Sequence, residues 1–398
     1  MANTLNLGDG NWATKEDSLL AYNSENNNYK PLPFDFSRDG LATVINKDGL
    51  IETVGNNVPR IDYKDNTKGA LLLEPSRMNS LLQSNQFDTT WIIGASALDL
   101  TSGQSGVYGS NDAWLLKKNA TGSRYIQQSL SLSSAQYSYS IYLKAESTNW
   151  VYLQSSDGSS EVTSYFDLEN GVVGTTAGSN LDSATIDNAG NGWYRCTLTY
   201  TQATSYVRIY PADSNGSISP TNDNGIYIQY AQLEQGSYPT SYIPTQGVVT
   251  RLADSCSQTP PDGVIGQTEG TMFLEYPNID DLFAFIGLSI NGGNSNRMVI
   301  YSIGDNTLKA QFRQGGAITL SGISSIINGK VKAALSFSST ESVFYVNGIQ
   351  VAVGTAIAFT GLNQVSLNQA NQIGGKIKEL KIYNTRLSNS ELQALTQV

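Results

Sequence analysis

Histidine is absent from this chain of 398 residues, and its two cysteines, Cys196 and Cys256, lie sixty positions apart. Without histidine, a histidine general base, a Ser-His-Asp triad and a histidine-ligated zinc or iron site are excluded. The cysteines match no C-x-x-C or zinc-ligand spacing. We therefore expect two unpaired thiols that act as small hydrophobic groups, with a bridge between them as the alternative.

Charged residues are also scarce. They make up 15% of the chain, with a net charge of -10 and no basic cluster, whereas about a quarter of an ordinary globular chain is charged. Binding to nucleic acid through its phosphates needs a positive stripe, so we expect no nucleic-acid partner. No apolar run approaches the roughly 18 residues of a membrane span, so we expect no membrane insertion. The start, MANTLNLGDGNWATKEDSLL, lacks a basic segment followed by an apolar one, and we expect no secretory signal.

Asparagine, serine, threonine, glutamine and glycine supply the missing polarity, and tyrosine, at 22 residues, is the main aromatic. Such a composition favours many short strands joined by polar turns, with surfaces suited to neutral polar ligands. The length exceeds what one hydrophobic core usually serves, so two or three domains are expected.

Period-2 alternation predicts a first block of strands between residues 85 and 248. We expect strands at 113–117, 124–130, 137–145, 150–155, 161–167, 192–200, 206–210 and 225–233. The last of these runs into a stretch broken by Gly236, Pro239 and Pro244, where proline removes a ladder donor. We interpret residues 225–254 as the closing edge of one domain and the tether to the next.

Signals on either side of this block also predict hairpins and strands. Before it, residues 23–40 are turn-rich and extended, 41–54 predict a hairpin, and 69–79 predict a short apolar strand stopped by Pro75. After it, Asn347-Gly348 predicts a hairpin tip, because both residues tolerate a positive φ. Ser388, with Glu391 three residues on, predicts a capped helical turn near the end of the chain.

Three parts of the chain resemble known families. The series DFSRDGLATVINKDGLIE, VPRIDY and GALLLEPSRMNSLLQSNQFDTTW resembles the N-terminal region of tailed-bacteriophage virion proteins, including fibre-like proteins of phages of the Bacteroidetes group. The phrases YSYSIYLKA, YFDLENG, NGWYRCTLTYT and GIYIQYAQLEQG resemble jelly-roll modules of the carbohydrate-binding type. The phrases YVNGIQVAVG and IGGKIKELKIYNTRLSNSELQAL resemble the LamG or concanavalin A-like lectin fold.

Pattern and resemblance together predict an all-β chain of two consecutive antiparallel β-sandwiches (jelly rolls) preceded by an extended N-terminal segment. The expected units are an attachment or collar segment at 1–84, a carbohydrate-binding-module-like jelly roll at 85–248, a linker at 249–261 and a LamG-like jelly roll at 262–398. Packing of the first segment against the following domain is the alternative to attachment.

Aromatic side chains are where sugar binding would show, because the apolar face of a sugar ring stacks on a flat side chain. Trp150 and Tyr152 alternate onto one face with Gln154, and we expect them to form an exposed ligand-binding platform. Trp193, at the start of a strand, is expected to be a packing residue. In YSYSIYLK either Tyr137, Tyr139 and Ile141 or the alternate residues face the core, and the pattern leaves this open.

No metal ligand is assigned. The loop 212–225 holds Asp213, Asn215, Asp223 and Asn224, oxygen-bearing residues of the kind that bind Ca²⁺. They lack the spacing of an EF-hand loop, and clustered Asn and Asp usually make turns, so we expect a turn and no cofactor, with Ca²⁺ as the alternative.

No catalytic residue is assigned either. A glycoside hydrolase needs two carboxylates roughly 5–10 Å apart across a cleft, and residues 262–398 contain no run of acids at alternate positions of one strand. The acids there are scattered, although acids from different strands can converge: Glu269, Glu275, Asp280, Asp281, Glu341 and Glu379. We expect a protein that is not an enzyme.

The expected function is that of a structural protein of a fibre or surface appendage of a phage virion, displaying glycan- or receptor-binding modules for host attachment. Its expected partners are other virion proteins, bound through the N-terminal segment, and a host cell-surface glycan. Because fibres multiply weak sites, we expect a homo-oligomer, a homotrimer above all. The expected location is the virion surface after assembly in the host cytoplasm. A decoration or adaptor protein without glycan binding is the alternative, and a polysaccharide depolymerase is a third.

Overall fold

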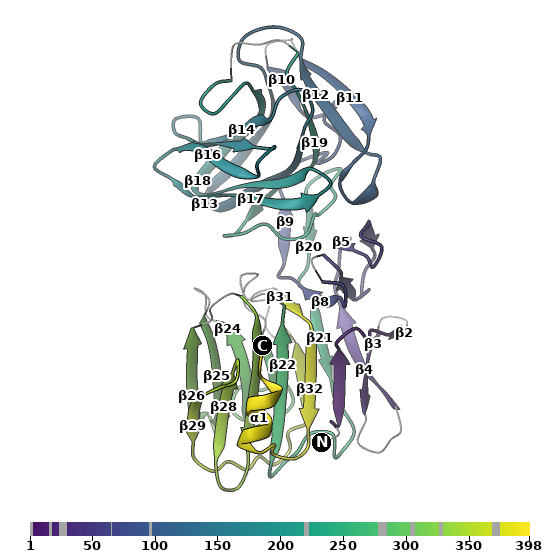
Figure 1. The fold of residues 1–398 in the computed structure, drawn as a ribbon, viewed down its shortest axis with the longest axis vertical. Helices are drawn as coiled ribbons and strands as arrows, with labels where there is room; N and C mark the ends of the chain where they lie inside the picture. Colours follow the sequence, from purple (N-terminus) through teal and green to yellow (C-terminus); the bar gives the residue numbers. More distant parts are fainter. Residues whose placement is uncertain are drawn as a thin grey trace.

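The computed structural model describes residues 3–15, 18–23, 30–64, 66–94, 98–218, 223–277, 285–302, 307–325, 329–367 and 375–398. The fold is all-β, with two antiparallel sandwiches stacked end to end and a narrower waist between them (Figure 1). Among the described residues, the α-helix is the short α1 (Asn389–Leu395), with a 3-10 turn at Val107–Gly109. No helix in the described part of the chain has the length and hydropathy needed to cross a membrane.

The middle sandwich has two layers that share two long strands, β13 (Tyr125–Ala145) and β18 (Trp193–Ala212). Their pairing shifts register between Ser129 and Ala135, where both strands pass from one layer to the other. We call the two layers sheet I and sheet II. Sheet I adds β10 (Ile92–Gly94), β14 (Trp150–Ser156), β15 (Glu161–Asp167) and β16 (Val172–Ala177). Sheet II adds β11 (Leu98–Gln104), β12 (Ala113–Lys118), β17 (Leu181–Gly190) and β19 (Gly225–Gln235).

The core of this sandwich shows which face of the segment YSYSIYLK is buried, which alternation alone left open. Tyr137, Tyr139 and Ile141 lie in the core with Val151 and Leu153 of β14, whereas Ser138, Ser140 and Tyr142 lie on the outer face of sheet II. Trp193 is 1% exposed, which confirms that it is a packing residue. Cys196 and Cys256 are both buried and free, as expected.

The C-terminal sandwich is built from one long sheet that folds over on itself. Its strand order is β26-β25-β24-β23-β30-β21-β4-β3-β1-β32-β22-β27-β28-β29, with β2 (Thr14–Lys15) paired to β3. The strands from the C-terminal third are β22 (Gly270–Tyr276), β23 (Phe285–Ser289), β24 (Arg297–Ser302), β25 (Thr307–Gln314), β26 (Ala317–Ser325), β27 (Val331–Phe337), β28 (Ser342–Val346), β29 (Ile349–Gly354), β30 (Gln364–Leu367) and β32 (Glu379–Tyr383). Asn347 and Gly348 both have positive φ at the β28–β29 tip, and Ser388 caps α1 in a capping box with Glu391, so both predictions are confirmed.

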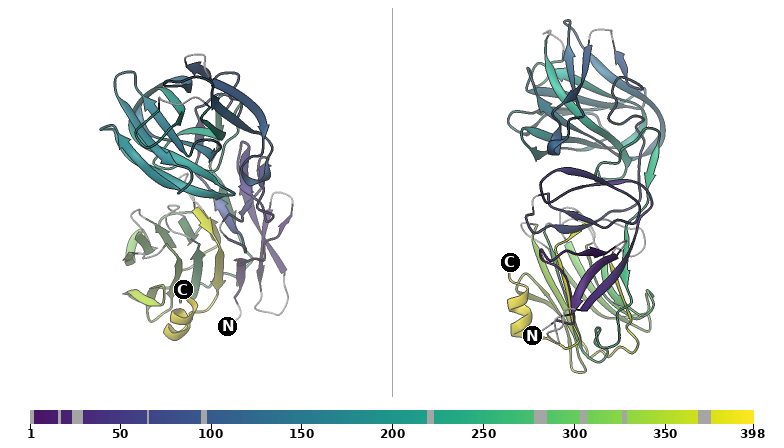
Figure 2. Two further views of the ribbon diagram at one scale, coloured as in Figure 1. Left: turned by 45° about the horizontal axis from the view of Figure 1, so that its top comes forward. Right: turned by 90° about the vertical axis from the view of Figure 1, so that its right-hand side faces the viewer.

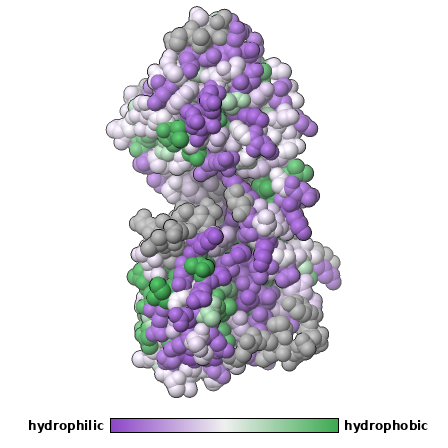
Figure 3. All heavy atoms as spheres, viewed as in Figure 1, coloured by the Kyte–Doolittle hydropathy of each residue, from purple (hydrophilic) through white to green (hydrophobic). Residues whose placement is uncertain are grey.

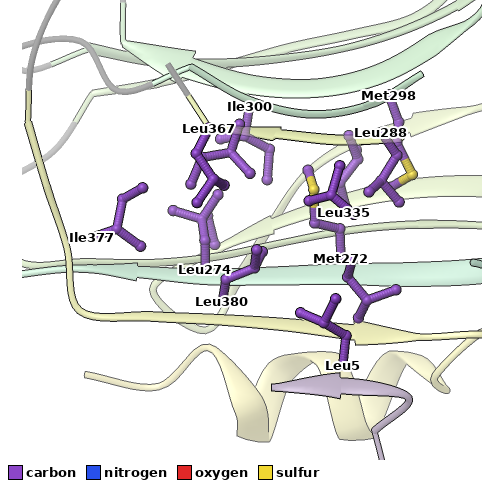
Figure 4. Packing of buried hydrophobic residues seen from close by; sticks show 14 of the residues in the cluster. Leu5, Met272, Leu274, Leu288, Met298, Ile300, Leu335, Leu367, Ile377 and Leu380 are labelled. Carbon is purple, nitrogen blue, oxygen red and sulfur yellow. The ribbon is translucent and has the colours of Figure 1, made fainter. Parts of the chain in front are cut away.

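Four strands from the beginning of the chain complete this sheet, β2 among them, which differs from the expected division into units. β1 (Leu5–Gly8) pairs with β32, β3 (Ser18–Asn23) pairs with β1, and β4 (Lys30–Ser37) pairs with β21 (Ser255–Gln258). Leu5 lies in the same core as Met272 and Leu380 (Figure 4). Residues of the expected attachment segment and linker are therefore part of the C-terminal sandwich. The reason is that residues 225–254 lead the chain back beside its own N-terminus, where open strand edges are available to pair.

The waist consists of short strands from three parts of the chain, residues 42–79, 249–251 and 375–377 (Figure 2). The hairpin β5–β6 (Ala42–Ile45, Ile51–Val54) confirms the one expected at 41–54. β7 (Arg60–Asp62) and β8 (Ala70–Leu73) pair with β31 (Gly375–Ile377), and β9 (Arg77–Asn79) pairs with β20 (Val249–Arg251).

A buried ion network ties the waist together. Arg60 contacts Glu74 at 2.7 Å and Asp254 at 2.5 Å, Arg38 contacts Asp254 at 3.3 Å, and Arg251 contacts Glu74 at 2.9 Å. All three arginine side chains are fully buried. Removing one partner from such a network leaves an uncompensated buried charge, so the network fixes how the N-terminal segment and residues 241–254 lie against each other.

Candidate functional site

Trp150 and Tyr152 come together on the outer face of sheet I, as the alternation predicts. Their strand, β14, lies between β18 and β15. Val151 and Leu153 point inward and are fully buried, whereas Trp150 and Tyr152 point outward and are half-buried. A central strand that is packed on its inner side holds its outer side chains in fixed positions.

Tyr152 belongs to a row of four tyrosines, one from each of four neighbouring strands. Tyr125 of β13, Tyr210 of β18, Tyr152 of β14 and Tyr165 of β15 follow one another across the sheet, with Tyr210 and Tyr165 directly opposite Tyr152. Successive ring centroids are 5.0, 5.2 and 4.5 Å apart. These separations are those of favourable aromatic pairs, so each ring fixes the next. We call these four residues the tyrosine row.

Arg208 lies beside the tyrosine row and is held by it. Its guanidinium lies 4.2 Å from the centroid of Tyr125 and 4.1 Å from that of Tyr206. Its Nε donates to Gln127 Oε1 at 2.7 Å and its Nη1 donates to Gln154 Oε1 at 3.2 Å. Among the described residues, the other terminal nitrogen, Nη2, has no hydrogen-bond partner and is available as a donor. A cation between two rings is positioned at little further cost in side-chain entropy.

The hydroxyl groups of this face are donors at neutral pH. Burial raises the pKa of Tyr152 and of Tyr210, so both phenols stay protonated. The Tyr210 hydroxyl donates to Gln154 Oε1 at 2.8 Å, and the Tyr206 hydroxyl donates to Glu161 Oε1 at 3.2 Å. The face therefore combines flat rings with fixed donors and acceptors.

Two glycines make room for the aromatic rings at the edges of the outer face of sheet I. A Cβ on Gly94 of β10 would lie 2.4 Å from the ring of Tyr125. A Cβ on Gly174 of β16 would lie 2.7 Å from the ring of Trp150 and 2.7 Å from Asn215 Oδ1. Both distances are too short for a real contact, so only glycine allows the neighbouring rings to close over the backbone at these points. We call the outer face of sheet I, with Trp150, Tyr206, Arg208 and the tyrosine row, the tyrosine face.

Part of this face was missed by sequence analysis, although a signal was present. In the segment YVRIYP, Tyr206, Arg208 and Tyr210 alternate with Val207 and Ile209, the same period that pointed to Trp150 and Tyr152. Alternation alone does not say that two distant segments are neighbours. The pairing of β18 with β14 supplies that information.

The loop considered for Ca²⁺ makes structural contacts in its described part. Asn215 Oδ1 accepts the backbone N–H of Thr175 at 2.8 Å, and Asn224 Nδ2 donates to Asp213 Oδ1. Lys118 Nζ lies 3.9 Å from the same Asp213 oxygen. Within the described residues, no group of three or more His, Cys, Asp or Glu side chains is placed to hold a metal.

Two acids of the C-terminal sandwich do converge from different strands. Glu275 of β22 lies directly opposite Glu379 of β32. Lys378 binds Glu275, and Lys381 Nζ lies 2.6 Å from Glu379 Oε1. Each carboxylate is thus committed to an ion pair. Glu341 is bound by Arg386, and Asp280 and Asp281 lie outside the described residues.

Comparison with known proteins gives a limited result. No protein-family model matches the chain, and no curated protein matches it. Among solved structures, the chain is similar to the Ruminococcus gnavus IT-sialidase CBM40 bound to α2,3-sialyllactose, with 20% identity over 33% of this chain and 84% of that one and a TM-score of 0.28. A SAP-like pentraxin from Limulus polyphemus matches with 11% identity over 33% and 70% of the two chains and a TM-score of 0.27. Domains LG4-5 of the mouse laminin α1 chain match with 10% identity over 70% and 89% and a TM-score of 0.26. Similarity at this level assigns no function to the chain.

Proposed function

We propose that this chain binds a cell-surface glycan through the tyrosine face and does so as a structural protein of a fibre or appendage on a phage virion. The observation that carries the binding part is the tyrosine row, with Arg208 fixed beside it on a central sheet. Sugar rings have apolar faces that stack on aromatic rings, and their hydroxyls need donors and acceptors at fixed positions. The tyrosine face supplies both.

The virion part of the proposal rests on the resemblance of the N-terminal phrases to phage fibre-like proteins. A fibre presents several copies of a weak site at once, so the proposed form is a homotrimer on the virion surface, assembled in the host cytoplasm. The proposed role is adsorption rather than catalysis. In support, Glu275 and Glu379, which do converge, are each paired with a lysine.

One observation favours a second candidate, an adaptor whose sandwiches make only protein contacts. Large hydrophobic side chains are exposed around the waist, and Figure 3 shows hydrophobic residues at its right-hand side, where Figure 1 draws β5. These side chains are between 37% and 54% exposed: Leu41, Leu50, Val58, Met78, Leu82, Val248 and Leu252. Exposed apolar patches of this kind mark protein contacts, but they say nothing against a glycan site elsewhere on the chain.

Glycan-array binding of the wild type and of two variants tests the proposal. Trp150→Ala and Tyr152→Ala remove the outward rings of β14 without opening the core, because both side chains are half-buried. Each should weaken binding by about 1–2 kcal/mol, roughly 5- to 30-fold in Kd. Tyr227→Ala, which removes a half-buried ring from the outer face of sheet II, is the matched control and should bind as the wild type does.

The outcomes separate the two candidates. A wild type that binds no glycan and no host cell supports the adaptor. Equal loss in Tyr152→Ala and Tyr227→Ala would remove the tyrosine face from consideration. Immunogold labelling of purified phage particles tests the virion part independently, since labelling confined to unassembled protein would contradict it.

A further inference from the structure

A hollow lies between the N-terminal hairpin and the middle sandwich, away from the tyrosine face. It has a volume of about 770 Å³ and is lined by residues between positions 41 and 249. Leu41, Thr43, Ile51 and Thr53 line it from the β5–β6 hairpin. The other walls are formed by Gln83, Asn85, Gln86, Ser102, Gly103, Asn111, Asp112, Trp114, Tyr230, Tyr242, Pro244, Thr245, Gln246, Gly247 and Val249. We call it the junction cleft. Its volume lies within the range of small-ligand sites.

The chemistry of the lining is neutral and rich in hydrogen-bonding groups. Five side-chain amides line the cleft: Gln83, Asn85, Gln86, Asn111 and Gln246. Thr53, Ser102 and Thr245 add hydroxyls, and Trp114 adds an aromatic edge. None of the lining residues is a lysine or an arginine, so the cleft offers no cationic side chain to pair with an anion.

One carboxylate lines the cleft, and its orientation is fixed. Asp112 Oδ2 accepts from Asn85 Nδ2 at 2.8 Å, and Oδ1 accepts from Gln229 Nε2 and from the Tyr230 hydroxyl, at 3.3 Å for the latter. A carboxylate and amides held in this way present acceptors in preset directions. Ligands with many hydroxyl donors suit such a set.

The walls of the junction cleft also store backbone strain. Gln83 and Tyr230 both line it with positive φ, at 48° and 53°. A positive φ is costly for residues other than glycine and is retained only where the surroundings impose it. Here Asn85 Oδ1 accepts the Tyr230 backbone N–H at 3.0 Å, and the Tyr230 ring stacks on Tyr242 at 4.3 Å.

An unmet hydrogen-bonding group lies in the same wall. Gln83 Oε1 is buried and has no hydrogen-bond partner among the described residues. A buried acceptor without a partner costs free energy unless something occupies its place. Strain and an unmet acceptor therefore coincide with the cleft, which points to a built site rather than to a chance gap between two surfaces.

We infer that the junction cleft is a second glycan site, which takes a neutral oligosaccharide and requires the N-terminal hairpin as one wall. The inference does not depend on the tyrosine face, because no residue is shared between the two. It gives the hairpin a part in ligand binding besides its part in packing. A chain that lost the hairpin would lose this site and keep the first.

The test uses a substitution that fills the cleft without disturbing its walls. Gly247 lines the cleft, has no positive φ, and would have no atom within 4 Å of an added Cβ. Gly247→Trp should therefore fold normally and occupy the cleft with its indole. Gly55→Trp is the matched control, since Gly55 also has open space and no positive φ and does not line the cleft.

Both variants are made in the Tyr152→Ala background, so that binding at the tyrosine face does not mask the result. Cellotriose, mannotriose and N-acetylchitotriose are titrated calorimetrically, with sialyllactose as an anionic probe. We expect at least one neutral trisaccharide to bind Tyr152→Ala and Gly55→Trp with the same affinity. The same trisaccharide should bind Gly247→Trp at least tenfold more weakly. Sialyllactose should not bind at this cleft. The inference is overturned if no neutral trisaccharide binds Tyr152→Ala, or if Gly247→Trp and Gly55→Trp bind equally. Loss of binding in Tyr152→Ala with an intact wild type would leave the proposed function standing and remove only this second site.

Discussion

The two outer faces of the middle sandwich carry similar residue types, but another segment of the chain covers only one of them. The outer face of sheet I carries Trp150, Tyr152 and Arg208, which are half-buried, beside Tyr165 and Tyr210, which are at most 9% exposed. The outer face of sheet II carries Tyr142, Trp193 and Arg195, which are at most 8% exposed. In each case an arginine lies over a tyrosine ring, Arg208 over Tyr125 at 4.2 Å and Arg195 over Tyr142 at 5.4 Å.

A third segment makes the difference. The hairpin β5–β6 and residues 238–245 lie over sheet II, where Ile51 and Tyr242 pack against Tyr142 and Tyr230. The fit is imperfect, since a cavity of about 150 Å³ remains between them. No described segment packs on sheet I in this way apart from the loop at Asn215 near its edge. Aromatic and cationic side chains thus serve as a packing surface on one side and as a candidate binding surface on the other.

The largest expected effect comes from breaking the ion network that holds the covering segment. Asp254→Ala leaves the buried Arg38 without a carboxylate and leaves Arg60 with Glu74 alone, and should lower the free energy of unfolding by about 3–5 kcal/mol. Urea unfolding measures this. Asp9→Ala, which breaks an exposed pair with Lys68, is the control and should cost no more than about 1 kcal/mol. Equal losses would show that the buried network does not hold the waist.

Lowering the pH should weaken the same ion network. Burial alone would raise the pKa of Glu74, but Arg251 and Arg60 outweigh it and hold the pKa well below its ordinary 4.5. Stability from this group is therefore complete above pH 4.5 and is lost as the pH falls below it. We expect Glu74→Gln to be much less stable than the wild type at pH 7 and to approach it at pH 3. A difference in unfolding free energy that stays constant with pH would refute this.

Substituting Arg195 and Arg208 in turn should show that one face serves stability and the other serves glycan binding. Arg195→Ala removes a buried side chain that bonds Ser140 and stacks on Tyr142, and should cost about 2 kcal/mol of stability. Arg208→Ala should cost less than about 1 kcal/mol of stability but weaken glycan binding about tenfold. Thermal unfolding and glycan titration are measured on both. Arg195→Ala should bind the glycan as tightly as the wild type does. A loss of glycan affinity in Arg195→Ala would mean that sheet II takes part in binding.

The smallest effect is expected from Tyr206→Phe. This change keeps the ring against Arg208 and removes only the hydrogen bond to Glu161. Stability should change by less than about 1 kcal/mol, and glycan affinity by less than in Tyr152→Ala. If Tyr206→Phe weakened binding more than Tyr152→Ala, the hydroxyls rather than the rings would be the main determinant.

Local patterns predicted the elements that depend on neighbours in sequence. The β5–β6 hairpin, the Asn347-Gly348 tip and the Ser388–Glu391 capping box all agree with the structure, because turn chemistry and capping act over a few residues. Alternation also gave the outward direction of Trp150 and Tyr152. It did not join 124–130 to 137–145, or 192–200 to 206–210, which are single strands β13 and β18 that cross between layers at bulges.

Local patterns did not predict which distant strands pair with each other. Nothing in LNLG of β1 indicates that it pairs with a strand 375 residues later, since pairing depends on where the chain returns and not on the strand itself. The junction cleft likewise combines residues from 41 to 249 that no local pattern connects.

Composition and alternation by themselves determined that this chain is all-β, that it cannot use histidine chemistry, and that its strands have one apolar and one polar or aromatic face. Tertiary structure alone decided which of those outward faces stays open. A face is covered or free according to whether a distant segment packs on it, and that segment is placed by burial of Arg38, Arg60 and Arg251 with Glu74 and Asp254. Such contacts join residues separated by up to 216 positions, a distance over which sequence periodicity carries no information.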